Sequence, residues 1–288
     1  ANLLNSITNI KKNGNYDLSE IFIIPKGKAS ALNRANDMGA ALEFFMKDSI
    51  CNTFKEKDLQ KKKDAYKENF SYFGTQNHPP DLILKNGDAM EVKKKDGVGN
   101  SELQLNSSYP KSKIYSSSTL ITQACKDCEE GWVEKDMIYS VGFVDDNNLK
   151  LLTLVYGDCY AASPEIYEKV KNKVIDGIGE SIENSADTNE LGRLNGIDPL
   201  KITNMRIRGM WTIQNPLSVF SDIFGYQKGE SNFTLIALMK KKKYASYPEK
   251  DRKAIENDKD IKVQIVKIQE PDNPTKQTEA VLIKFDVK

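Results

Sequence analysis

Two carboxylates and a lysine are the residues of this sequence best placed to do chemistry together. Asp81 follows Pro80, and Glu91 and Lys93 come next in the pattern PD-x9-E-x-K. Carboxylate oxygens are hard ligands that suit Mg²⁺, which keeps several waters of its own. A metal there stabilises the charge that develops on a phosphate under attack and lowers the pKa of a bound water. Lys93 can orient or activate that water, so the pattern predicts metal-assisted chemistry at a phosphate.

The same pattern also fits an exposed strand face with a salt bridge, because 29% of the chain is charged. Three features favour the chemical interpretation. Pro80-Asp81 is followed by an apolar strand, one strand register places all three groups on one face, and a Lys-rich, hydroxyl-rich segment follows.

The elements that must position these groups form a predicted β-hairpin around Asn86-Gly87. A two-residue loop would mix apolar and acidic residues on each face. A three-residue loop with Gly87 in the left-handed conformation pairs Leu82 with Met90 and sets Asp81 opposite Glu91. Since a one-residue slip flips every side chain, the apolar pattern selects this second register.

A helix predicted over residues 33–51 carries a third carboxylate, Glu43. Its apolar residues have helical spacing, and the small residues Ala40 and Ala41 predict a close approach between helix and sheet. A charged helix is expected at about 54–69.

The rest of the chain predicts mixed strands and helices. Strands are expected at 137–144, 149–156, 203–209, 232–239, 261–268 and 280–287, and helices near 117–127, at 164–183 and from Pro216. Residues 99–118 are expected to form a loop, or a strand plus a loop. We expect one α/β (α+β) domain over residues 1–288, with a lobe boundary near the turn-rich 184–200.

Several function classes are excluded or disfavoured by the composition. His78 is the only histidine, and neither a G-x-S-x-G, a P-loop nor a G-x-G-x-x-G motif is present. Cys125 and Cys128 have the spacing of a metal knuckle but form a lone pair, whereas a structural zinc site needs four ligands. We expect reduced thiols and a cytoplasmic location in a prokaryotic cell. We expect neither a secretory signal nor a membrane span.

The near-neutral net charge excludes only a protein whose whole surface is basic. Forty-two Lys and Arg oppose 41 Asp and Glu, which gives a net charge of +1. Local basic surfaces around a centre of carboxylates are compatible with that balance.

Several longer stretches of the sequence, beyond the three motif residues, resemble those of a known protein family. The stretches are Asn33–Phe45, Gln76–Ile83, Glu91–Lys94, Leu105–Lys113, Tyr156–Ala162 and Met205–Trp211. Together they resemble the NgoPII-type family of type II restriction endonucleases, within the PD-(D/E)xK nucleases. The resemblance implies a restriction-endonuclease-like core, in which a mixed central sheet is flanked by helices, with additional C-terminal strands.

The resemblance also implies an activity and its partners. It implies a Mg²⁺-dependent endonuclease that acts as a homodimer on double-stranded DNA at a GGCC palindrome, with a DNA methyltransferase as its functional companion. Carried over by residue, it implies metal contacts at Asp81, Glu91 and Val92, catalytic support from Lys93, and an outer carboxylate at Glu43.

Candidates for DNA contact are donors and acceptors in the polar segments that follow the motif. Arg, Lys and amide donors suit the acceptors of G·C pairs, and other contacts go to phosphates. The candidates are Lys94, Gln104, Asn106, Ser107, Ser108, Lys111, Lys113, Arg206 and Arg208. Tyr109 and Trp211 are expected to be supporting aromatics.

Two other hypotheses stay open at this point. One is a DNA-binding protein that keeps a nuclease-like core without turnover, against which the intact Asp81, Glu91 and Lys93 argue. The other is a structure-specific repair nuclease or resolvase on the same core.

Overall fold

The computed structural model describes residues 1–21, 34–75, 78–105, 108–178 and 190–288. Within those ranges a nine-stranded mixed sheet forms the centre of the molecule. Its strands, in spatial order, are β1 (Phe70–Thr75), β2 (His78–Leu84), β3 (Ala89–Asp96), β6 (Glu134–Asp145), β7 (Asn148–Tyr156), β11 (Phe233–Lys240), β13 (Asn273–Val287) and β12 (Lys262–Glu270), with β5 (Lys113–Tyr115) paired to β6. The β3–β6 and β7–β11 pairs are parallel and the other pairs are antiparallel. This confirms the mixed α/β fold class.

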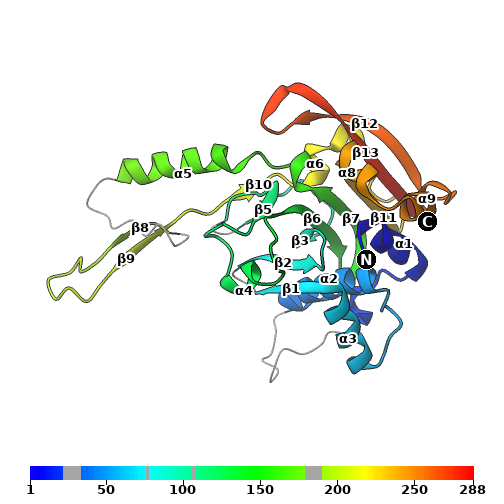
Figure 1. Cartoon of the computed structure of the whole chain (residues 1–288), viewed down its shortest axis with the longest axis horizontal. Helices are drawn as coiled ribbons and strands as arrows, with labels where there is room; N and C mark the ends of the chain where they lie inside the picture. Colours follow the sequence, from blue (N-terminus) through cyan, green and yellow to red (C-terminus); the bar gives the residue numbers. More distant parts are fainter. Residues whose placement is uncertain (22–33, 76–77, 106–107, 179–189) are drawn as a thin grey trace.

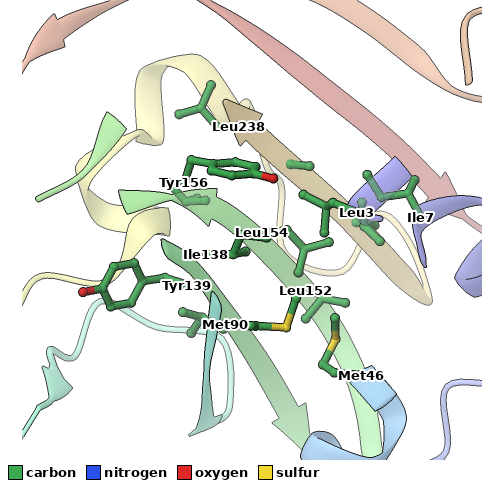
Figure 2. Packing of buried hydrophobic residues seen from close by; sticks show 14 of the residues in the cluster. Leu3, Ile7, Met46, Met90, Ile138, Tyr139, Leu152, Leu154, Tyr156 and Leu238 are labelled. Atoms are coloured by element: carbon green, nitrogen blue, oxygen red, sulfur yellow. The ribbon is translucent and has the colours of Figure 1, made fainter. Parts of the chain in front are cut away.

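Helices cover the sheet and bury an apolar core. The principal ones are α1 (Leu3–Asn13), α2 (Arg34–Cys51) and α3 (Leu59–Asn69). Figure 2 shows Leu3 and Met46 from the helices packed near Met90 and Leu152 from the strands, and all four residues are buried. Burial of this apolar surface is the main driving force for holding α1 and α2 on the sheet.

The close approach of α2 to the sheet uses small residues on both elements. Ala41 of α2 is fully buried. A Cβ on Gly142 of β6 would lie 2.7 Å from a methyl carbon of Leu42, so a small residue of the sheet also admits the helix.

The hairpin register is confirmed, and its turn needs one correction. Leu82 pairs with Met90 and Ile83 with Ala89, as the three-residue loop requires. Asn86, with φ of 54°, takes the left-handed conformation in the turn, and Gly87 does not. Asn tolerates that region better than most residues, so Gly87 is not needed there.

Shorter elements complete the body. They are η1 (Leu18–Glu20), β4 (Leu103–Gln104), α4 (Gln123–Lys126), η2 (Gly157–Cys159), β10 (Thr212–Ile213), α6 (Pro216–Val219), α7 (Ser221–Phe224), α8 (Lys241–Ser246) and α9 (Glu249–Glu256). Of the helices in the described ranges, none has the length and apolar composition needed to cross a membrane.

An arm extends from this body to the left in Figure 1. It consists of α5 (Pro164–Ile178) and the hairpin of β8 (Glu190–Leu194) and β9 (Met205–Arg208). The helix expected at 164–183 is confirmed as far as Ile178, and residues 179–189 lie outside the described ranges. In the region expected to be a turn-rich lobe boundary, 190–194 form the first strand of the arm.

Candidate active site

The three motif residues meet where β2 separates from β3. The backbone pairing of the two strands ends at Leu82–Met90, and the Asp81 side chain continues the contact instead. The Val92 N–H donates to Asp81 Oδ2 at 2.6 Å, and Lys93 Nζ lies 2.6 Å from Glu91 Oε1. The hairpin therefore holds both carboxylates and the ammonium at one end of a rigid pair of strands.

The electrostatics of the site favour a cation. Burial, reinforced by the negative charge of Glu91, raises the pKa of Asp81 to about 8. Burial tends to lower the pKa of Lys93, but the charges of Glu91 and Asp81 outweigh it and hold that pKa above its usual range. A second positive charge beside Asp81 would let this carboxyl ionise.

One oxygen of the site is left without a partner. Glu91 is 8% exposed, and its Oε2 is buried and accepts no hydrogen bond from any described residue. A buried carboxylate oxygen in that state costs free energy unless a ligand satisfies it. Glu91 and its neighbour Asp81 form an oxygen donor set, to which the backbone carbonyl of Val92 would add a third oxygen.

That donor set fits a hard divalent cation. Across the described ranges, no three His, Cys, Asp or Glu side chains gather into a metal centre. Two carboxylates with a backbone oxygen suit Mg²⁺ in particular, because this ion binds through one or two carboxylates and retains water ligands.

Glu43 lies at the edge of this group. Its negative charge is close enough to contribute to the raised pKa of Asp81. Its Oε1 lies 2.6 Å from Lys47 Nζ, one helical turn along α2. The carboxylate of Glu43 is therefore part of the site's electrostatic surroundings and is already paired.

The polar segment after the hairpin divides into two groups. Lys111 is buried and interacts electrostatically with Glu91 and Lys93, and its Nζ donates to Ser108 Oγ. Lys113 pairs with Glu134 and Asp136 on β6. Asn106 and Ser107 lie outside the described residues.

The other candidate DNA contacts are spread over the molecule. Lys94 alternates to the opposite face of β3 from Lys93 and pairs with Asp96 at 2.5 Å. Gln104 is exposed on β4, opposite Thr212 of β10. Arg206 and Arg208 are exposed on β9 in the arm. The structure therefore brings Lys111, but not the arginines, to the carboxylates.

The aromatic residues of the arm's base are supporting residues, as expected. The Tyr109 ring stacks on Tyr167 of α5 at 5.3 Å, and both rings contact Trp211 edge-on. This cluster joins the segment that carries Lys111 to both parts of the arm.

Two glycines and a tyrosine support the site and were missed by the sequence analysis. A Cβ on Gly74 of β1 would lie 2.2 Å from the Pro80 carbonyl oxygen and 3.1 Å from the Asp81 Cα. A Cβ on Gly157 would lie 2.4 Å from the Lys111 carbonyl oxygen. The Tyr139 hydroxyl accepts the Lys111 N–H at 2.6 Å. An isolated Gly within a strand does signal close backbone approach, so Gly74 could have been noticed.

Comparison with known proteins gives two matches. The family model for NgoPII restriction endonuclease matches residues 1–269. The chain is 44% identical over 257 residues to the type II restriction enzyme NgoPII of Neisseria gonorrhoeae. The matched region covers 88% of this chain and 90% of that protein. No solved structure matches the chain.

Proposed function

The chain belongs to the NgoPII restriction endonuclease family, and from that premise we propose that it is a Mg²⁺-dependent type II enzyme that cuts duplex DNA at a GGCC palindrome as a homodimer. Membership of this family makes the protein a DNA endonuclease. The Mg²⁺ dependence, the GGCC recognition sequence and the homodimer are what we propose in addition. The proposal treats residues 1–288 as one catalytic domain.

The observation that carries the proposal is the buried Glu91 oxygen beside a carboxyl that is difficult to ionise. Asp81, Glu91 and the Val92 carbonyl would hold the ion, and Glu43 would add negative charge behind them. When bound, a divalent cation supplies positive charge that polarises the phosphodiester and offsets the charge developing on it. Lys93, held by Glu91, orients the attacking water and stabilises charge on the same phosphate.

DNA contacts are proposed for the polar residues around this centre. Phosphate contacts fix position, and base-edge contacts read the sequence. We assign these contacts to Lys94, Gln104, Asn106, Ser107, Ser108, Lys111, Lys113, Arg206 and Arg208. Arg206 and Arg208, exposed on the arm, are donors of the kind that reads guanine N7 and O6.

The arm supports the homodimer. Ile166, Val170 and Val174 recur every four residues along α5 and are 44%, 49% and 42% exposed. The loop and strands of the arm add Ile197, Leu200, Ile202, Met205 and Met210, all exposed. Contiguous exposed apolar residues mark an interaction surface. Two copies, each with one carboxylate pair, would let both strands be cut in a single encounter, so the proposed occupant is a second copy of this chain.

A plasmid cleavage assay tests the function. With Mg²⁺ the protein should give discrete fragments whose sequenced ends lie at GGCC, and methylation of that site should protect it. With Ca²⁺ it should bind without cutting. Asp81→Ala and Lys93→Ala should stop cleavage, whereas Lys85→Ala, exposed at the turn of the same hairpin, should not.

The outcomes separate the alternatives. Full activity of Asp81→Ala or Lys93→Ala would refute the assigned roles. Random nicking or cutting of branched DNA would favour a structure-specific nuclease, and binding without cleavage in any divalent metal would favour a non-catalytic DNA-binding protein.

A further inference from the structure

Lys111 is a buried ammonium without a carboxylate partner among the described residues. It is 7% exposed. Its Nζ donates to Ser108 Oγ and to the Tyr109 carbonyl at 3.3 Å, and it lies 5.3 Å from the centre of the Tyr109 ring. Burying a charged group with only neutral partners costs free energy. The fold keeps that charge inside although a neutral side chain would be more stable there.

The backbone pairing locates Lys111 on the face of the sheet that carries the carboxylates. Glu91 of β3 and Tyr139 of β6 are partners in the parallel pair, so their side chains share a face. Figure 2 shows the Tyr139 ring directed away from the packing of Met46 and Leu152. Since the Tyr139 hydroxyl accepts the Lys111 N–H at 2.6 Å, Lys111 lies over the face of Glu91 and Lys93.

The charges of the site act on Lys111 at that position. Burial lowers the pKa of Lys111 to about 8, Glu91 opposes this shift and Lys93 adds to it. Lys111 thus interacts with both members of the Glu91–Lys93 pair while its own hydrogen bonds go elsewhere.

A second contact fixes the Lys111 backbone from the other side. Gly157, which begins η2, approaches so closely that a Cβ there would lie 2.4 Å from the Lys111 carbonyl oxygen and 2.6 Å from that of Ser112. Tyr139 and Gly157 therefore both restrain the backbone at Lys111, one at its N–H and the other at its carbonyl.

We propose that Lys111 is a second active-site lysine, whose ammonium donates to a non-bridging oxygen of the same phosphodiester on which Asp81, Glu91 and Lys93 act. An ammonium has three donor hydrogens. Ser108 and the Tyr109 carbonyl accept two, which leaves the third for the substrate. Because the non-bridging oxygens gain negative charge in the transition state, a fixed buried cation stabilises that state more than the bound substrate.

This inference rests on the proposed function, and a set of variants tests it. Lys111→Met removes the charge and keeps the length of the side chain, and Lys111→Gln keeps a donor for Ser108 without the charge. Lys242→Met is the control, since Lys242 is exposed on α8 and is not among the residues assigned to the metal or to DNA. Single-turnover cleavage with Mg²⁺, DNA affinity with Ca²⁺ and thermal unfolding are measured for each variant, alongside the unmodified protein and Lys93→Ala.

The expected result combines lost chemistry with retained stability. Both Lys111 variants should cut about 100-fold or more slowly, as removal of one preorganised donor does in other enzymes. DNA affinity should change less than about tenfold, a range small beside the kinetic loss. Lys111→Met should unfold at an equal or higher temperature, because a buried charge with neutral partners has been removed.

Three results would overturn the inference. Either Lys111 variant could cut at the normal rate, DNA affinity could fall as much as cleavage, or both variants could unfold at a much lower temperature, which would make Lys111 structural. If the unmodified protein is folded but does not cut DNA, the proposed function fails as well. This outcome is distinct, because the variants and the unmodified protein then show the same absence of cleavage.

Discussion

At the scale of single residues, Asp81 couples the stability of the protein to its chemistry. The pKa of its carboxyl is raised from 3.8 to about 8, first by burial and then by Glu91. The folded protein therefore retains a proton that the unfolded chain releases above about pH 4. By linkage, the metal-free protein loses stability as the pH rises from about 4 to about 8.

Asp81→Asn tests this coupling. In the presence of a chelator, the variant should unfold at a higher temperature than the unmodified protein at pH 8, and the difference should shrink toward pH 4. Cleavage should be abolished, and Mg²⁺ should stabilise the unmodified protein more than the variant. Thermal unfolding from pH 4 to pH 8 is the measurement.

Asp96→Asn serves as the control, because Asp96 is exposed at the end of the same strand. A difference between Asp81→Asn and the unmodified protein that does not vary with pH would contradict the assignment.

The grouping of Asp81, Glu91 and Lys93 could be predicted from the sequence, because strand alternation and the turn fix which side chains share a face. The burial of Lys111 could not, since it depends on Tyr139 of β6 and Gly157 of η2, which are distant in the sequence. A hydroxyl-rich, Lys-rich segment has the same composition whether it lies on the surface or over a site.

At the scale of elements, β1 determines how closely the chain can pack beside Asp81. Gly74 lets β1 approach the Pro80–Asp81 backbone, and the β1–β2 register shifts between Phe73 and Thr75. A side chain at this position would push against backbone atoms, which cannot rotate away. The geometry of the Asp81 carboxylate is therefore set partly by a strand that contributes no functional group.

Gly74→Ala should lower both stability and cleavage. Overpacking costs on the order of 1–3 kcal/mol, and the displaced Asp81 should slow cutting. Gly39→Ala is the matched control: a Cβ there meets nothing within 4 Å, so α2 should be unharmed or slightly more stable. Chemical denaturation and plasmid cleavage measure the two effects, and normal cleavage by a destabilised Gly74→Ala protein would show that β1 does not position Asp81.

The junction of α2 and α3 contains a buried ion pair. Lys62 Nζ lies 2.6 Å from Asp48 Oδ2, and both side chains are almost fully buried. Thr53 and Tyr66 also donate to Asp48 at 2.6 Å. Since α2 carries Glu43, this polar cluster anchors an element of the site.

Lys62→Met should destabilise the protein by about 3–5 kcal/mol, because it leaves the Asp48 carboxylate buried without its ion-pair partner. The double variant with Asp48→Asn should recover part of the loss. Exposed Lys63→Met, one residue along α3, should change little. Denaturant titration of the unmodified protein, Lys62→Met, Asp48→Asn and the double variant gives the coupling free energy, and additive effects would exclude it.

Elements with a strong local pattern were predicted well, and those that depend on neighbours were not. The helix at 33–51 and the strands at 137–144, 149–156 and 232–239 correspond to α2, β6, β7 and β11. β1 was missed, as were helices α1, α8 and α9, and the strand plus loop allowed at 99–118 is found as two short strands, β4 and β5. The helix expected near 117–127 is reduced to the four residues of α4. Short strands gain their stability from pairing with a distant partner, which a local pattern does not contain.

At the scale of the whole molecule, the arm stands out because it extends from the body and exposes apolar residues. α5 carries an apolar stripe that the described structure leaves exposed. The same arm carries Arg206 and Arg208 and is joined at its base to the Lys111 segment through Tyr109 and Trp211. Its proposed cover is a second copy of the chain, which would set two carboxylate sites on one duplex.

Val170→Asp should convert a dimer to a monomer, because it places a charge at the centre of the stripe. Double-strand cutting should fall by at least tenfold at low protein concentration, with nicked plasmid accumulating. Asn172→Asp adds the same charge to α5 away from the stripe and should have no such effect. Light scattering with size exclusion measures the mass, and an unchanged mass for Val170→Asp would remove α5 from the interface.

The overall topology could be predicted only as a mixed sheet. Nothing in the local sequence says that β11 pairs with β7 in parallel, or that β13 lies between β11 and β12. Those neighbours are chosen by the packing of many apolar strands at once.

The strand order has a consequence for when this chain can become active during its synthesis. β7 stands beside β6, the neighbour of the site-bearing β3, and its other edge is covered only by β11. A ribosome-bound chain that ends before residue 233 has Leu151–Val155 as an unpaired apolar edge, and such an edge favours association over folding. The β7 edge of the sheet that holds the carboxylates is therefore paired only after β11 has been made, so we expect translation to delay the appearance of a DNA-cutting protein.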